Sequence, residues 1–251
     1  MKKFVYLFMS ATLFWAVGAS AAETGPVREF YACNYQEGKG LDDLMAVRDL
    51  LVEEIAKIGS ADLSNQVTFL WTPFKATTDW DFLWFDMHEN LNAMGRASDA
   101  YENSEAPAVL GPRFAEVLEC PSSGIVTHEQ IFEAAEEFVG DGPALVESFA
   151  CTFHPGKGVA DAREAVEFWQ KTIDDLGIYK SYSAFMQIPL VSGTGADLYY
   201  FAVHANMTDY AARTSAYRTS AAGMEADSRF DDVQRCNSSL WLGQIIINPD
   251  E

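Results

Sequence analysis

The sequence predicts an α+β fold made of two copies of a βαββαβ unit. Three segments recur along the chain at an almost constant distance. Cys33–Gly40 returns as Cys151–Gly158, 118 positions later, and two further segments return 116 positions later. These two pairs are Phe69–Pro73 with Phe185–Pro189, and Phe85–Asn90 with Phe201–Asn206. A repeat of this length and regularity indicates that one structural unit is used twice.

Each copy begins with a short strand followed by an amphipathic helix. The strands are expected over Arg28–Tyr35 and Leu145–Phe153. A Gly-Lys-Gly turn comes next in both copies, and apolar residues then recur every three or four positions, which is typical of one buried helix face. We expect the helices over Leu41–Ile58 and Val159–Leu176 because a glycine that can cap a helix follows each of them.

Two β-prone runs, a second helical region and a last strand complete each unit. The runs are rich in aromatic residues and are separated by turn-forming residues. Proline or glycine inside the second helical regions predicts a break there. The expected segments are Val67–Phe74, Asp81–Met87, Leu91–Glu119 and Gly124–Phe132 in the first copy, and Ser181–Val191, Asp197–His204, Met207–Arg235 and Leu240–Ile247 in the second. The resulting order is the split unit of ferredoxin-like folds.

The four cysteines are expected to form one disulfide in each copy. Each copy has one cysteine near its start and another near its end, and the βαββαβ order places the first and last strands side by side. We therefore predict the bridges Cys33–Cys120 and Cys151–Cys236, as in exported proteins. A metal site is the competing interpretation, and the absence of a Cys-x-x-Cys or Cys/His ligand spacing argues against it.

Residues 1–22 have the features of a secretory signal peptide. Two lysines precede an apolar run, and Ala19–Ala21 resembles a cleavage site. The apolar run is shorter than the roughly 20 residues that span a bilayer. We therefore expect a protein without a membrane span, exported to the periplasm or the extracellular space, with repeats over residues 23–139 and 140–251. The net charge of −20 argues against nucleic acid as a partner.

The third strand of each copy is apolar on both faces, as in Phe82–Phe85 and Leu198–Val203. A strand with one solvent-exposed face would alternate apolar and polar residues. We therefore expect the two sheets of a monomer to face each other about an internal pseudo-twofold axis. In this arrangement the chain resembles the dimeric α+β barrel superfamily, in the form where both halves are fused. The resemblance covers Pro26–Pro249 and implies a pocket in each half. It implies no single activity, because the superfamily includes haem peroxidases, haem-degrading enzymes, cofactor-free monooxygenases, cyclases and lactone isomerases.

A Phe-x-x-His-x-Asn motif at the end of each third strand is the best candidate for a functional site. It contains His88 and Asn90 in the first copy, and His204 and Asn206 in the second. The asparagines are expected to cap helices. A histidine beside aromatic walls can act as a general acid or base, or as a haem or metal ligand. The alternative is that both histidines only bond buried backbone groups. The cofactor is left unassigned, with haem as one candidate.

Further candidates for ligand contacts come from the aromatic strands and the glycine-rich turns. Trp71, Trp84 and Tyr200 belong to strands that form either a ligand site or a filled core. Lys39 and Lys157 precede helices, where a lysine and free backbone N–H groups can bind an anion. A tight turn with a solvated lysine is the simpler interpretation.

A binding protein is the leading interpretation of the sequence, and whether the protein is an enzyme stays open. No Gly-x-Ser-x-Gly, His-Glu-x-x-His or dinucleotide-binding motif occurs in the chain. We expect non-covalent binding of a small apolar or aromatic molecule. An enzyme of the same fold, haem-dependent or cofactor-free with an acid/base histidine, and a structural periplasmic protein are the alternatives.

Overall fold

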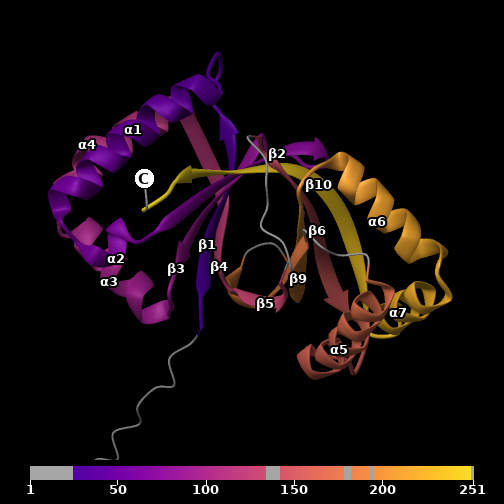
Figure 1. Ribbon diagram of the computed structural model, residues 1–251. Helices are drawn as coiled ribbons and strands as arrows, with labels where there is room; N and C mark the ends of the chain where they lie inside the picture. Colours follow the sequence, from indigo (N-terminus) through magenta and orange to yellow (C-terminus); the bar gives the residue numbers. More distant parts are fainter. Residues whose placement is uncertain (1–24, 134–141, 178–181, 193–194, 250–251) are drawn as a thin grey trace, which may run out of the picture.

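In the computed structural model, which describes residues 25–133, 142–177, 182–192 and 195–249, ten antiparallel strands form one curled sheet with seven helices outside it (Figure 1). The helices of the first half cover one side of the molecule and those of the second half cover the opposite side. The expected signal peptide lies outside the described residues. Within them, no helix is both long and apolar enough to cross a membrane.

Corresponding strands follow the same order within each half. The first half contains β1 (Val27–Tyr35), α1 (Leu41–Ile58), α2 (Ala61–Ser64), β2 (Val67–Lys75), β3 (Phe82–His88), α3 (Leu91–Glu102), α4 (Ala106–Val117), β4 (Leu118–Thr127) and β5 (Glu129–Phe132). The second half contains β6 (Ala144–Phe153), α5 (Val159–Leu176), β7 (Tyr182–Gln187), β8 (Pro189–Ser192), β9 (Leu198–His204), α6 (Met207–Thr219), α7 (Ala221–Asp231) and β10 (Gln234–Ile247). The strand orders are β2-β3-β1-β4 and β7-β9-β6-β10.

Strand pairing between the halves closes the sheet into a barrel. β10 pairs with β6 through Gln234–Gly243 and continues through Leu240–Ile247 along β2 of the first half. On the other side, β4 pairs with β8, and β5 pairs with β7. One residue separates β4 from β5, and one residue separates β7 from β8. These two pairings therefore join the two edges of the sheet. The faces that two separate sheets would expose to water are therefore buried.

The barrel interior is an aromatic core. Phe30, Trp71 and Phe85 of the first half pack in one cluster with Phe201 and Trp241 of the second half. The ring of Trp71 lies 4.4 Å from Phe85 and 5.2 Å from Phe201 between centroids. Trp71, which the sequence suggested as a ligand contact, thus belongs to the core that joins the halves.

The last strand of each half begins six residues earlier than the sequence predicts. β4 starts at Leu118 rather than Gly124, and β10 starts at Gln234 rather than Leu240. The added residues are mostly polar, and so they lack the apolar signal of a strand. They pair all the same with β1 and β6, because backbone hydrogen bonds extend a strand whatever its side chains are.

The strand predicted over Ser181–Val191 is two strands, β7 and β8, with Ile188 between them. They pair with different partners, β5 and β4. Residue 181 lies outside the described residues. The chain bends between β4 and β5, and one unbroken strand could not pair with both of them. No local sequence signal reveals this interruption.

Both predicted disulfides are present. Cys33–Cys120 and Cys151–Cys236 each have a Cα–Cα distance of 4.0 Å. The cysteines lie inside paired strands, and Cys151 directly opposes Cys236 across β6 and β10. Two disulfides are typical of a protein that folds in an oxidising compartment.

The second helical region of each half is split into two helices. In the first half α4 follows Glu105, and Pro107 occupies its first turn, where the missing N–H of proline costs no hydrogen bond. Pro112 lies inside α4 rather than ending it. In the second half the break falls at Ser220, whose side chain accepts a hydrogen bond from the Gly223 backbone N–H.

His128 lies between β4 and β5 in the barrel wall, and it is buried. Its ring stacks on Phe185 and Phe201, with centroids 4.5 and 5.5 Å away. Its Nδ1 lies 3.3 Å from Nε2 of Gln187. Burial and the nearby Arg28 guanidinium lower the pKa of His128 to about 2. The ring is therefore neutral throughout the physiological range.

We expect His128 to make the protein less stable in acid. Its pKa in the unfolded chain is close to 6.5, so below pH 6.5 the unfolded state binds a proton that the folded state excludes until about pH 2. The free energy of unfolding should therefore fall by about 2 kcal/mol between pH 7.5 and pH 5 because of this residue. His128→Gln places there the residue type of the aligned position 244. In urea unfolding, the free energy of unfolding of this variant should fall by about 2 kcal/mol less than that of the wild type between pH 7.5 and pH 5. Equal decreases in both proteins would contradict this role of His128.

Candidate functional site

Each half contains a pocket between its sheet and its helices. The first has a volume of about 560 Å³ and the second about 410 Å³. His88 and Trp84 line the first pocket, and His204 and Tyr200 occupy the aligned positions in the second. The structure therefore brings each candidate histidine together with one candidate aromatic residue, in two separate cavities.

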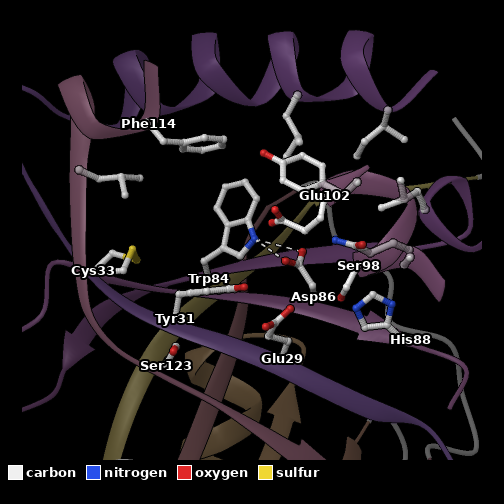
Figure 2. A pocket seen from close by; sticks show the side chains of 18 of the residues that line it. Glu29, Tyr31, Cys33, Trp84, Asp86, His88, Ser98, Glu102, Phe114 and Ser123 are labelled. Carbon is white, nitrogen blue, oxygen red and sulfur yellow. Dashed lines mark hydrogen bonds between the residues drawn. A yellow bond between two sulfur atoms is a disulfide. The ribbon is translucent and has the colours of Figure 1, made fainter. Parts of the chain in front are cut away.

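The first pocket has an aromatic and acidic lining (Figure 2). Trp84 is buried, and its ring meets Phe114 of α4 edge-on at 6.2 Å. The indole Nε1 donates to both carboxylate oxygens of Asp86, at 3.0 and 3.1 Å. Thr68 Oγ1 donates to Asp86 Oδ1 at 2.7 Å. Burial raises the pKa of Asp86 to about 6 and also raises the pKa of Glu29.

His88 lies at one side of this pocket, near Ser98 (Figure 2). It is 6% exposed, and its Nδ1 has no hydrogen-bond partner among the described residues. Burial lowers the pKa of His88, and the carboxylate of Asp62 opposes part of this effect. The imidazole is therefore neutral at pH 7 and has a ring nitrogen free to hydrogen-bond a ligand.

The second pocket buries polar atoms whose hydrogen bonding within the protein is incomplete. Among the described residues, both ring nitrogens of His204, the hydroxyl of Tyr200 and Oε1 of Gln234 make no well-formed hydrogen bond. Burial raises the pKa of Tyr200 to about 12, and the neighbouring Gln234 side chain opposes the rise. Burial, with Arg213, lowers the pKa of His204 to about 4. Because buried polar atoms are nearly always hydrogen-bonded, these atoms are available to a ligand.

Charged residues face the second pocket from both the sheet and the helices. Glu147 of β6 accepts a hydrogen bond from the Tyr210 hydroxyl at 3.3 Å and lies 4.0 Å from Nε2 of His204. Arg213 of α6 is 5% exposed and pairs with Asp209 at 2.9 Å. The second pocket thus contains charges of both signs, whereas four carboxylates and neither Lys nor Arg line the first.

The two asparagines of the motif act as helix caps outside the pockets. The side-chain oxygen of Asn90 accepts from the Ala93 backbone N–H at the start of α3. Asn206 accepts in the same way from Asp209 at the start of α6. These contacts agree with the capping role expected from the motif.

Lys39 and Lys157 also lie away from the pocket linings. Their Nζ atoms are 3.1 Å from Asp43 and Asp161, in the first turn of the helix that follows each lysine. Both aspartates also accept from a glycine backbone N–H at the helix start. An internal carboxylate therefore already occupies each helix N-terminus, in agreement with the tight-turn interpretation.

Several pocket residues have no counterpart among the sequence-based candidates. Glu29 and Glu147 align at the 118-residue offset, and Tyr101 and Tyr217 align at the 116-residue offset. All four line the pockets. They belong to no recognisable motif, and only a search of the two copies for matching polar residues could have found them. Within the described residues, no three His, Cys, Asp or Glu side chains are grouped to hold a metal ion.

The chain matches no protein-family model and no curated protein. Several solved structures are similar to it. A protein assigned as a chlorite dismutase has 11% identity and a TM-score of 0.53, with 88% of this chain and 95% of that chain covered. A protein assigned as a monooxygenase from Fusobacterium nucleatum subsp. nucleatum has 10% identity and a TM-score of 0.56, with 89% of this chain and 93% of that chain covered. The chlorite dismutase from Candidatus Nitrospira defluvii in complex with imidazole has 11% identity and a TM-score of 0.52, with 90% of this chain and 93% of that chain covered.

The chain shares an α+β barrel fold with these proteins. At these identities the likeness concerns the fold alone and assigns no activity to this α+β barrel protein. Its function has to be argued from its own pockets.

Proposed function

We propose that this α+β barrel protein is an exported protein that binds small apolar or aromatic molecules non-covalently in its two pockets. The duplication of the pocket is the observation that supports this proposal most directly. Both cavities fall within the roughly 300–1,000 Å³ that is usual for ligand sites. Aromatic walls surround the unbonded Nδ1 of His88 in the first pocket, and they surround several buried polar atoms without a well-formed hydrogen bond among the described residues in the second. A bound molecule would complete the hydrogen bonds of these atoms.

The proposal includes the organisation of the chain. Residues 23–139 and 140–251 are tandem ferredoxin-like repeats that form an internal pseudo-dimer, and residues 1–22 are a signal peptide. The identical strand order of the halves and the matching disulfides support the repeat. The disulfides also support export.

Native mass spectrometry of the protein purified from an oxidising compartment tests this proposal. We expect a monomer that has lost residues 1–22, is four hydrogens lighter than the reduced chain, and retains one or two small molecules. A broad set of aromatic compounds should also raise the melting temperature of any ligand-free fraction. A protein that retains nothing and shows no thermal shift with any compound would contradict the binding function.

Catalysis in the second pocket is a second candidate function. His204 is 2% exposed, and neither ring nitrogen makes a hydrogen bond among the described residues, although the Glu147 carboxylate lies 4.0 Å from Nε2. Its lowered pKa keeps the ring neutral at pH 7, the state of a general base or of a haem ligand. The likeness to proteins assigned as chlorite dismutase and monooxygenase makes an enzyme worth testing.

The two pockets differ in how they fit haem, whose negatively charged propionates are favoured by cationic partners and opposed by buried carboxylates. The first pocket, with four carboxylates and neither Lys nor Arg in its lining, does not fit the group. In the second pocket His204 would hold the iron and Arg218 a propionate. Bound haem would supply redox chemistry at that site.

Titration with haem distinguishes these interpretations spectroscopically. If the second pocket takes haem, the wild type should shift the haem absorption band, and His204→Ala should abolish the shift. His88→Ala is the matched control and should leave the spectrum unchanged. A wild-type protein that leaves the haem spectrum unchanged would exclude the group.

A further inference from the structure

We propose that the first pocket binds a small organic cation, a protonated amine carried by an apolar or aromatic body. This inference rests on the proposed function and names the ligand class of one of its two sites. Three features of the lining point to a cation: an excess of carboxylates, aromatic walls around them, and a buried imidazole nitrogen without a partner.

The carboxylates approach the pocket from two sides, the sheet and the helices. Glu29 on β1 and Asp86 on β3 are directly opposed in the sheet. Glu102 of α3 faces them from the helix side, as Figure 2 shows. Like charges on opposed strand positions destabilise a sheet, and burial raises the pKa of both Glu29 and Asp86. A cation between them would remove this repulsion.

The second half indicates that the fold itself does not need this acidic pair. The aligned positions, Glu147 and Ala202, are also directly opposed, but only one of them is an acid. Glu102 aligns with Arg218, so a cation replaces the third carboxylate. The excess of negative charge is therefore particular to the first pocket, and a ligand explains it better than packing does.

Aromatic rings surround the carboxylates of the first pocket. Tyr31, Trp84, Tyr101 and Phe114 line the cavity. The face of an aromatic ring attracts an ammonium group that lies within about 6 Å, most strongly where water is excluded. The pocket volume of about 560 Å³ leaves room for an apolar body attached to the charged group.

His88 adds a neutral polar atom on the side of the pocket where Asp86 and Glu29 lie (Figure 2). Its Nδ1 is buried and has no hydrogen-bond partner among the described residues. A neutral imidazole can accept an N–H from an ammonium group and adds no positive charge to repel it. A protonated amine would therefore satisfy the imidazole and the carboxylates together.

Isothermal titration calorimetry with three compounds of similar shape tests the charge preference. The probes are phenethylamine (cationic), 2-phenylethanol (neutral) and 3-phenylpropionate (anionic). We expect phenethylamine to bind at least about tenfold more tightly than 2-phenylethanol. No heat of binding to this pocket is expected for 3-phenylpropionate.

Matched variants locate the binding. Asp86→Asn keeps the side-chain shape and an oxygen for the Trp84 and Thr68 hydrogen bonds, but it removes the charge. It should weaken phenethylamine binding about tenfold and leave 2-phenylethanol binding unchanged. Glu29→Gln should also weaken phenethylamine binding. It replaces Asp86→Asn in this test if that variant folds poorly. Glu147→Gln changes the aligned acid of the second pocket and tests whether the amine binds there instead.

The outcomes separate this inference from the function on which it rests. Equal affinities for the amine and the alcohol would overturn the cation preference while the binding function stands. A loss of amine binding in Glu147→Gln, but not in Asp86→Asn or Glu29→Gln, would place the cation in the second pocket and overturn the inference. If no probe binds, the inference also fails, and a molecule retained in native mass spectrometry would still uphold the binding function.

Discussion

Replacing both Cys33 and Cys120 with alanine is expected to lower the free energy of unfolding by about 4 kcal/mol. The bridge joins residues 87 positions apart. Without it, the unfolded chain regains the conformational freedom that closure of this long loop removes. Urea unfolding of the wild type and the double variant measures the difference.

The second bridge provides the internal control. Cys151 and Cys236 are 85 positions apart, so replacing both with alanine should lower the free energy of unfolding by nearly the same amount. The helices and strands of both variants should persist in circular dichroism. A loss below about 1 kcal/mol in both variants would mean that the reduced, unfolded chain is already compact.

Replacing Arg28 with methionine is expected to raise the free energy of unfolding by about 1–4 kcal/mol. Arg28 is 2% exposed and lies inside the barrel, and its Nε and Nη1 have no partner among the described residues. Its guanidinium carbon lies 4.6–5.5 Å from the ring centroids of Phe69, Trp71, Phe85 and Phe201. These contacts offset only part of the cost of burying the charge. Burial accordingly lowers the pKa of Arg28 to about 9.

The pH dependence of this variant tests the cause. Because the pKa of Arg28 is lower in the folded state than in the unfolded state, the cost is fully present below pH 9 and decreases as the pH rises toward 12.5. The advantage of Arg28→Met should therefore shrink above pH 9. Arg28→Lys keeps a charge and should be less stable than Arg28→Met. A methionine variant less stable than the wild type by 2 kcal/mol or more at pH 7 would show that the ring contacts outweigh desolvation.

Local signals in the chain determined several elements of the fold. The first helix of each half spans the predicted residues, Leu41–Ile58 and Val159–Leu176, because the apolar period and the following glycine act within a few residues. Both disulfide pairings also followed from the sequence, since the βαββαβ order brings the first and last strands together. The motif histidines His88 and His204 line the pockets because each lies at the end of a strand, on the face that the helices cover.

Other features depend on contacts between distant segments, and these the sequence did not reveal. Trp71 and Trp84 are both strand tryptophans, yet Trp71 points into the closed barrel while Trp84 lines a pocket. Only the closure of the sheet through β10 and β4–β5 separates the two environments.

The acidic pair of the first pocket has the same origin. Glu29 and Asp86 oppose each other because β1 and β3 pair in one register, and a shift of that register by one residue would turn one of them into the barrel. Composition, periodicity and the internal repeat thus determined the elements and their order in this chain. The tertiary structure decided which side chains share a cavity, because strand register and sheet closure are set by packing across the whole molecule.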